Sequence, residues 1–234
     1  MTQSESGTPG GDTGPHRLLA RFTPGERWVH RSLAVLMAIC LITAACLYIG
    51  PIAVLVGRRG LFKTLHVYAG LALPLPILIG LTSRAFRNDL GRFNRFTPAD
   101  WTWLRSKDRR TGRVPIGKFN PGQKLNAAFI AAPASAQADQ RIPCAILVLL
   151  GSGVILGWPD PWPLSIRQGA TFVHDWLAAA VVIMIAGHLW FASHDPIARA
   201  GLRTGFVPAD WAEREHPSWL REEGMDSTSG TVGP

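Results

Sequence analysis

Four long apolar runs dominate the pattern of hydrophobic and polar positions along the chain. They cover residues 28–49, 61–81, 142–158 and 170–193. A helix needs about 20 apolar residues to cross the hydrocarbon core of a bilayer, which is about 30 Å thick. The third run is near the lower limit of length, because polar residues at 139–141 interrupt the apolar stretch before it. The pattern predicts an all-α membrane protein, built as a four-helix transmembrane bundle.

Proline and glycine mark where these helices end or bend. Gly50-Pro51 follows the first run, and a proline-rich turn at residues 159–163 separates the third run from the fourth. Pro74 and Pro76 fall inside the second run. They predict a kink there, because proline removes a backbone donor from a helix.

The distribution of charge indicates how the helices are oriented. The net charge is +8, and residues 83–124 hold eleven lysines and arginines against three aspartates. Loops rich in Lys and Arg stay on the cytoplasmic side, so this segment is expected to face the cytoplasm from the plasma (inner) membrane. Four spans then place both termini in the cytoplasm, in a multi-pass protein.

Composition excludes several other classes of function. The basic residues flank apolar segments, and no helix-turn-helix, zinc-finger or RNP pattern is visible. We therefore expect membrane lipid, and no nucleic acid, as a partner. Cys40, Cys46 and Cys144 lie within apolar stretches and form no C-x-x-C motif. This argues against a zinc ribbon, an iron–sulfur cluster or a disulfide framework.

Both ends of the chain are polar. Residues 1–24 are rich in Gly, Ser, Thr and Pro and lack the apolar segment of a signal peptide, and residues 221–234 have a similar composition. Such segments bury too little apolar surface to fold. They predict disordered tails on either side of a domain at 25–220.

Histidines within the apolar runs are the candidate functional residues. His174 and His188 stand fourteen positions apart, which places both on one side of a helix, about 21 Å apart along its axis. Each would lie near one leaflet. Ionisable residues inside a membrane are rare and usually functional. His16, His194 and His216 lie outside the predicted spans and are expected to be solvated.

The topology pairs the membrane histidines by depth. His30 begins the first span, which runs outward from the cytoplasm, so it lies at the inner level together with His188. His66 begins the second span, which runs inward, so it lies at the outer level together with His174. The fourth helix thus contributes one histidine to each pair.

Two facing imidazoles are compatible with several roles. Zinc usually takes four protein ligands, or three and a water, and the chain offers no carboxylates or thiolates to complete such a set. A haem needs only two axial ligands, so the pairs favour two haems, with Gly70 and Gly187 making room for the rings. The alternatives are hydrogen bonds that join helices and ordinary small packing residues, or a membrane metal transporter or di-iron enzyme, although no H-x-x-H pair is present.

A second polar group precedes the third span. Residues 117–124 read Gly-Lys-Phe-Asn-Pro-Gly-Gln-Lys, in which Asn120 and Gln123 offer amide donors at the level of the inner pair. A quinone headgroup has two carbonyl acceptors that need such donors in an apolar pocket. The same residues could instead cap the start of a helix.

These residues together resemble the b-type cytochrome (gamma) subunit of respiratory formate dehydrogenase, within the family of four-helix dihaem cytochromes b. The resemblance covers about residues 21–220. Its matching elements lie at 21–22, 26–30, 65–70, 117–120, 122–124, 174–176, 187–190 and 205–219. The Gly-Lys-Phe-Asn and Gly-Gln-Lys elements favour formate dehydrogenase over nickel–iron hydrogenase, whose b-type cytochrome subunit is the alternative.

The resemblance implies an electron-transfer subunit that carries two haem b groups and reduces menaquinone or another quinone. The implied haem ligands are His66 with His174 and His30 with His188, and the implied quinone site is carried by Asn120, Gly122 and Gln123.

The resemblance also implies partner subunits. The chain has no ligand set for molybdenum, nickel or an iron–sulfur cluster, so it is not expected to oxidise formate alone. An iron–sulfur subunit and a molybdopterin catalytic subunit would supply the electrons. Residues 133–141 depart from the family pattern and look like an insertion before the third span.

Overall fold

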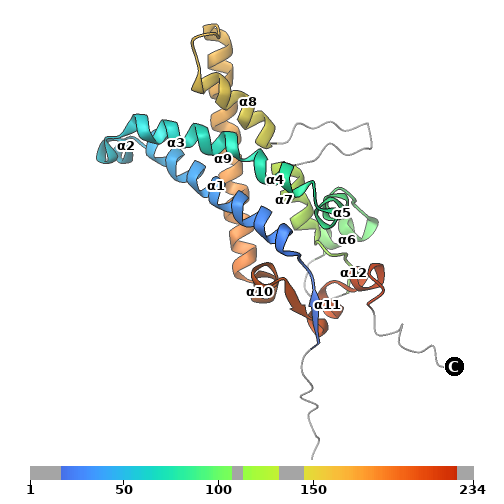
Figure 1. Ribbon diagram of the computed structural model, residues 1–234. Coiled ribbons are helices and arrows are strands. Elements are labelled where there is room, and N and C mark those ends of the chain that lie inside the picture. The colour runs from blue at the N-terminus through green and yellow to red at the C-terminus, as the bar shows by residue number, and fades with distance from the viewer. Residues whose placement is uncertain (1–16, 107–112, 132–144, 226–234) are drawn as a thin grey trace, which may run out of the picture.

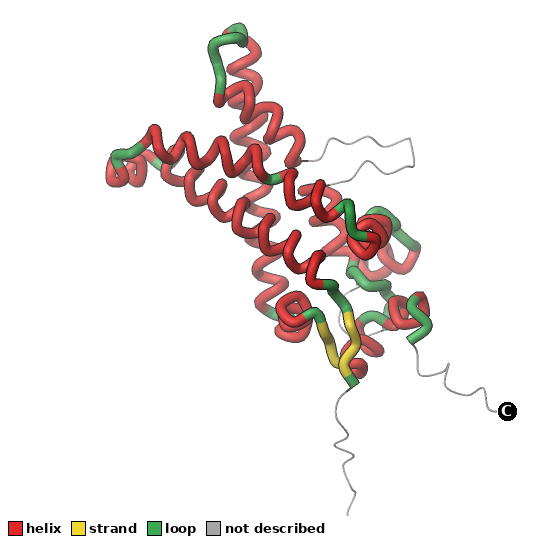
Figure 2. Tube along the Cα trace, viewed as in Figure 1, coloured by secondary structure: helices red, strands yellow, loops and turns green. Residues whose placement is uncertain are grey.

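The computed structural model describes residues 17–106, 113–131 and 145–225 (Figures 1 and 2). These residues form helices and one short antiparallel sheet of two strands. In chain order the elements are β1 (Leu18–Ala20), α1 (Pro24–Tyr48), α2 (Gly50–Val56), α3 (Arg59–Ala72), α4 (Pro74–Gly80), α5 (Arg84–Phe93), α6 (Pro98–Arg105), α7 (Pro121–Ala131), α8 (Ala145–Gly157), α9 (Leu164–Ser193), α10 (Pro196–Thr204), β2 (Phe206–Pro208), α11 (Ala209–Glu215) and α12 (Pro217–Glu222).

Three helical stretches are long and apolar enough to cross a membrane. They are Pro24–Tyr48, Arg59–Gly80 and Leu164–Ser193, which match three of the four predicted spans. The fourth, predicted at 142–158, is an apolar helix of 13 residues in the part that the structure describes, Ala145–Gly157. Residues 142–144 and the predicted insertion at 133–141 lie outside the described residues.

The sequence explains where the membrane helices start and break. At the start of α1 the Thr23 side chain accepts from the Glu26 backbone, and the Glu26 carboxylate accepts from the Thr23 backbone at 2.7 Å, which is a capping box. The predicted kink in the second span is confirmed. Helix α3 ends at Ala72 and α4 begins at Pro74, because prolines 74 and 76 cannot donate to the preceding turn.

The long helices are arranged as two packed pairs. Helix α1 lies against α3, α8 lies against α9, and α3 also contacts α8. Helix α9 crosses the α1–α3 pair rather than running parallel to it (Figure 1). A small cluster of Cys40, Ala69 and Leu73 fills the α1–α3 interface. Small residues such as Ala69 let membrane helices approach closely.

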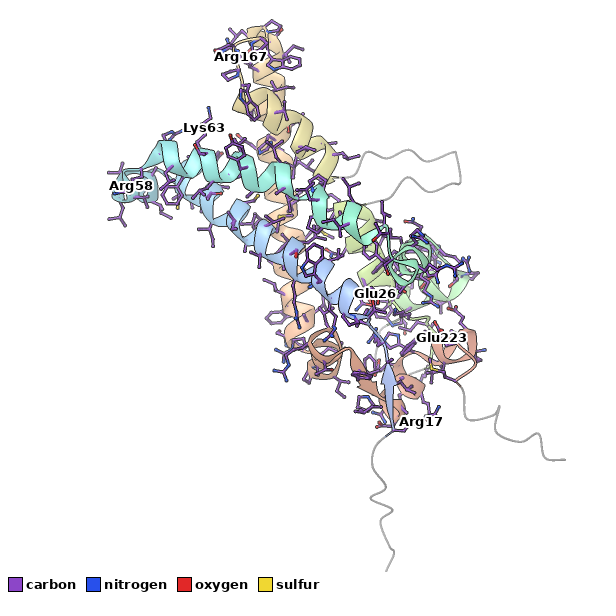
Figure 3. The ribbon with its side chains drawn as sticks, viewed as in Figure 1. Arg17, Glu26, Arg58, Lys63, Arg167 and Glu223 are labelled. Carbon is purple, nitrogen blue, oxygen red and sulfur yellow. The ribbon has the colours of Figure 1, made fainter. Side chains whose placement is uncertain are left out.

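Charged side chains gather at the two ends of the bundle (Figure 3). Arg58, which follows α2, and Arg167, in the first turn of α9, lie toward one end of the molecule. Arg17 and Glu223, near the two limits of the described chain, lie toward the other end. Both ends of the described chain therefore lie toward this second end of the molecule.

A folded cap at this second end replaces part of the predicted tails. Leu19 pairs with Val207 in the β1–β2 ladder, and both side chains join a buried cluster. The tail predicted through residue 24 is thus wrong from residue 18 onward, because Leu18 and Leu19 gain a strand partner from the far end of the chain. Residues 1–16 lie outside the described residues.

The C-terminal tail is also shorter than predicted. Helix α12 continues to Glu222, and Met225 packs against the buried cluster of the cap. The cluster consists of Leu19, Val207, Trp211, Ala212, Trp219 and Leu220. Its large aromatic side chains bury enough apolar surface to order residues 221–225, and residues 226–234 lie outside the described part of the chain.

We expect Gly205→Ala to destabilise the cap much more than Gly57→Ala. Both glycines have positive φ, +96° and +63°, so each alanine suffers a left-handed backbone strain of about 1 kcal/mol. A Cβ at Gly205 would also lie 2.7 Å from the Phe22 carbonyl oxygen, whereas one at Gly57 would meet no described atom within 4 Å. Gly205→Ala should therefore cost roughly 1–3 kcal/mol more. Thermal unfolding in detergent, followed by circular dichroism, measures the difference; equal melting temperatures would contradict it.

Candidate functional site

Two pairs of histidines meet across the long helices. The imidazole of His30 on α1 lies against that of His188 on α9, with ring centres 6.3 Å apart. The imidazole of His66 on α3 lies against that of His174 on α9, with ring centres 6.1 Å apart. The structure thus brings together the same partners that the topology predicted.

The separation of the rings suits one metal ion between each pair. A bond from a metal to an imidazole nitrogen is about 2 Å long, and the ring centre lies roughly 1 Å further on. Two such bonds in line put the ring centres about 6 Å apart, which is the spacing in both pairs. The described residues contain no group of three or more His, Cys, Asp or Glu side chains that could hold a metal. Further ligands would have to come from a group such as a porphyrin.

Hydrogen bonds fix the tautomer of His66 in the His66–His174 pair. His66 Nδ1 lies 3.1 Å from the Cys40 carbonyl oxygen. A carbonyl only accepts, so Nδ1 carries the proton and Nε2 keeps its lone pair for a metal. The Thr43 hydroxyl oxygen lies 3.0 Å from the same Nδ1. It donates its own proton to backbone carbonyls of α1, so toward Nδ1–H it acts as an acceptor.

His174 is oriented in the same way from α8. Its Nδ1 lies 3.0 Å from Ser152 Oγ, and that hydroxyl donates to the Val148 carbonyl at 2.8 Å. The serine oxygen therefore accepts from Nδ1–H, which again leaves Nε2 for a ligand. Partners of this kind hold the ring orientation of metal-binding histidines. Sequence reasoning missed Thr43 and Ser152, although a hydroxyl in an apolar run at a histidine's depth was the available signal.

Glycines border the histidine pairs. A Cβ at Gly153 would lie 3.4 Å from Cε1 of His174, so the ring packs closely on α8. A Cβ at Gly70 or Gly187 would meet no described protein atom within 4 Å. That openness is compatible with the predicted room for a flat ring, and the role of these two glycines stays a prediction.

The predicted quinone residues form the N-terminal cap of α7. The Asn120 backbone N–H donates to Gln123 Oε1 at 3.0 Å, and the Gln123 N–H donates to Asn120 Oδ1 at 2.9 Å. The capping role that the sequence left open is therefore present. It uses the side-chain oxygens and not the NH₂ groups, which are the atoms a quinone carbonyl would need. A Cβ at Gly122 would lie 3.3 Å from Asn120 Oδ1 and press on this cap.

Two buried lysines anchor the same loop. Lys118 Nζ lies 2.6 Å from Asp89, and Lys124 Nζ lies 2.7 Å from Asp100. All four side chains are at most 7% exposed, so each charge depends on its partner. In the sequence these lysines counted only toward the basic loop, yet the two aspartates are two of the three acids within it.

His216 is buried and links the folded cap of the bundle to this loop. The expectation that it is solvated is therefore wrong. Its Nδ1 donates to the Gly117 carbonyl at 2.7 Å, and its Nε2 accepts from Arg21 at 3.2 Å. Arg21 also donates to the Lys118 carbonyl at 2.7 Å. Burial and the nearby guanidinium lower the pKa of His216 to about 3, and burial lowers the pKa of Arg21 to about 10. His216 is therefore neutral in the folded protein at pH 7. His194, by contrast, is exposed as expected.

Comparison with known proteins identifies relatives that match most of the chain. It is 24% identical over 219 residues to the cytochrome b556(fdo) subunit of formate dehydrogenase from Escherichia coli (strain K12), a match that covers 87% of this chain and 92% of the relative. The chain is homologous to cytochrome b556 subunits of formate dehydrogenases. No protein-family model matches it.

A second group of relatives agrees over a shorter length. The cytochrome b556(Fdn) subunits of nitrate-inducible formate dehydrogenase from Escherichia coli (strain K12) and from Shigella flexneri are 30% identical over 113 residues. These matches cover 46% of this chain and 45% of each relative. The resemblance read from the motifs is thereby confirmed by independent matches.

We expect His216→Phe to flatten the acid side of the stability profile. The His216 pKa is about 3 when folded and about 6.5 when unfolded. Its stabilising contribution is therefore complete above about pH 6.5 and falls by up to about 1.4 kcal/mol per pH unit below it. Asp89 acts in the opposite sense, because its folded pKa is raised to about 6 and stability is lost as pH rises toward that value. Asp89 is present in both proteins, so its effect cancels in the comparison.

Thermal unfolding at about pH 7 and about pH 5 measures this prediction. Between about pH 7 and about pH 5, the wild type should lose more stability than His216→Phe does. His194→Phe, at an exposed histidine, should keep the wild-type slope. A steep acid loss that persists in His216→Phe would show that another group controls it.

Proposed function

We propose that the protein is the membrane electron-transfer subunit of a formate dehydrogenase, passing electrons through two b-type haems to a quinone. The homology to cytochrome b556 subunits supports a membrane electron-transfer role. The observation that carries the proposal is the pair of imidazole contacts at 6.1 and 6.3 Å, each spaced for one metal between two rings.

The histidines would serve as axial ligands, His66 with His174 at one level and His30 with His188 at the other. The haem would supply reversible one-electron chemistry at its iron. The protein's part is to bring two imidazoles together at each level, to hold the Nδ1–H groups of His66 and His174 on backbone and hydroxyl oxygens, and to keep the surroundings apolar.

The direction of transfer follows from the proposed topology. The folded cap and the basic segment 83–124 would face the cytoplasm, which places His30 and His188 at the inner level. An iron–sulfur subunit, fed by a molybdopterin catalytic subunit, would deliver electrons at the outer level. Moving one electron inward against 100 mV costs about 2.3 kcal/mol, so the donor must be strongly reducing, as formate is.

The quinone would bind at the loop that precedes α7. Asn120 and Gln123 have their amide groups there. Gly122 adds no side chain beside them, where a Cβ would lie 3.3 Å from Asn120 Oδ1. Menaquinone or another quinone would accept electrons from the inner level at this point. The relatives that match are formate dehydrogenase subunits, so we propose this partner rather than a nickel–iron hydrogenase.

Alanine substitutions should remove the haems in pairs. His66→Ala and His174→Ala should each abolish the same haem signal, and His30→Ala and His188→Ala the other, because a bis-histidine iron loses one axial ligand in every case. Reduced-minus-oxidised spectra with a haem count on the purified protein test this. His194→Ala, outside the spans, should keep both signals. Loss of different haems within one pair, or a colourless wild-type protein, would refute the proposal.

The hydroxyl partners of the outer pair should affect haem retention. We expect Thr43→Val and Ser152→Ala to weaken haem binding about tenfold at the outer level, because His66 and His174 lose a contact that orients their rings. Thr64→Val is the matched control, since the exposed Thr64 hydroxyl bonds only to its own helix, at the Gly60 carbonyl. Haem transfer to apomyoglobin measures retention, and equal release from all three variants would contradict the assignment.

A further inference from the structure

Three ionisable side chains from separate segments meet beneath the loop at 117–124. They are Glu26 from the first turn of α1, Asp89 from α5, and Lys118 from the loop itself, and they are 8%, 4% and 6% exposed. Lys118 Nζ lies 2.6 Å from Asp89 Oδ2 and 3.7 Å from Glu26 Oε1. One buried ammonium thus faces two carboxyl groups.

One carboxyl oxygen in this cluster has no hydrogen-bond partner among the described residues. Glu26 Oε2 accepts from the Thr23 backbone N–H and hydroxyl at 2.7 and 2.8 Å. Glu26 Oε1 is buried and has no hydrogen-bond partner among the described residues. Its 3.7 Å separation from Lys118 Nζ is too long for a hydrogen bond. A buried polar atom without a partner is costly and needs an explanation.

A proton between the two carboxyl groups supplies that explanation. The Glu26 and Asp89 carboxyl groups flank one ammonium, with oxygens 3.7 and 2.6 Å from Lys118 Nζ. Carboxylates that share a site in this way repel, so such a pair holds one proton and titrates as a unit. Burial and the Glu26 carboxyl raise the pKa of Asp89 to about 6, although Lys118 opposes the shift. A shared proton gives Glu26 Oε1 its missing partner.

The carboxyl pair lies between the proposed inner haem level and the proposed quinone loop. Glu26 precedes His30 by one helical turn on α1. Lys118 precedes Asn120 by two residues, and between them Phe119 stacks on Phe93 of α5 at 3.9 Å. The cluster is therefore close to the residues that would receive the quinone.

A charged chain links the pair to the surface. Arg92 bonds to Asp89 Oδ1 at 3.0 Å and also contacts the carboxylate of Glu223. The exposed fraction of these side chains falls from 38% for Glu223 to 28% for Arg92 and 6% for Asp89. The other charged groups that act on the pair are Lys118, Glu222 beside Arg92, and Arg21.

We propose that the Glu26–Asp89 carboxyl pair is the proton donor for the quinone reduced at this loop. This inference rests on the proposed function. Reduction of one quinone to quinol takes two electrons, which the haem chain would supply, and two protons, one for each carbonyl oxygen. In each protonation the shared acid O–H breaks, an O–H bond forms on the quinone, and a carboxylate remains. A proton from solvent then passes Arg92 and reprotonates the carboxylate. A second cycle supplies the second proton.

The test uses the full-length protein in membranes, with its haems reduced by dithionite. Addition of a water-soluble naphthoquinone reoxidises the haems, and the rate is recorded at several pH values by the haem absorbance. The wild-type rate should fall as pH rises above about 6, since the pair then loses its proton. Asp89→Asn and Glu26→Gln should each be about a hundredfold slower at the low-pH plateau, because a general acid is missing, and their rates should lose this pH dependence.

Asp100→Asn is the matched control. Asp100 is a buried carboxylate that pairs at 2.7 Å with Lys124, in the first turn of α7. Its loss leaves the Lys124 charge uncompensated, so Asp100→Asn should slow the reaction by disturbing the loop but keep the wild-type pH profile. Loss of the pH dependence in Asp100→Asn as well would show that any lost lysine partner produces this effect, and would overturn the proton-donor assignment. Wild-type kinetics in both Asp89→Asn and Glu26→Gln would overturn it as well.

A second measurement does not depend on turnover. The infrared difference spectrum between oxidised and reduced wild-type protein should contain a protonated-carboxyl band that shifts in D₂O and disappears in Glu26→Gln and Asp89→Asn. Absence of this band in the wild type, while both haems reduce normally, would overturn the proton-donor inference and leave the proposed function standing. A wild-type protein without haem, or with haems that no quinone reoxidises, would instead overturn the proposed function.

Discussion

The placement of histidines from one long helix opposite those of two others is the constraint on which the rest of the site depends. Helix α9 places His174 opposite His66 of α3 and His188 opposite His30 of α1. Lipid chains are as apolar as leucine, so helices in a membrane gain little from burying apolar surface against one another. Helix α9 packs mainly against α8, and the two histidine pairs mark where it passes the α1–α3 pair. A group held between the rings of each pair would tie α9 to α1 and α3.

At the folded end of the bundle the organising principle is the neutralisation of buried charge. Lys118 and Lys124 of one short loop point inward to Asp89 and Asp100 from α5 and α6. Removing one partner from a buried pair leaves an uncompensated charge, which costs about 3–5 kcal/mol. The same rule accounts for Arg21, whose guanidinium lies 4.8 Å from the centre of the Trp211 ring and donates to the Lys118 carbonyl. The loop is thus held from several directions by buried side chains.

The membrane part was predictable from the sequence, and the cap was not. Length and hydropathy locate the spans, proline predicts the break at Leu73, and topology alone pairs the four histidines, because depth in a bilayer is a one-dimensional coordinate that sequence order encodes. The folded cap depends on contacts between distant segments, such as β1 with β2. No local sequence pattern predicts such contacts. The same reason hid the roles of His216 and Lys118. His216 was expected to be solvated and Lys118 counted only toward the basic segment, because the partner of each comes from another segment of the chain.

The bond between His216 and Gly117 spans 99 positions of the chain, and the bond between Arg21 and His216 spans 195. During synthesis at roughly 5–20 residues per second, all the membrane helices are therefore made before the residue that ties the ends together emerges. A chain that stops short of residue 216 lacks both bonds, which leaves the loop before α7 without these two contacts. The order of synthesis thus places the fastening of this loop after that of every apolar helix.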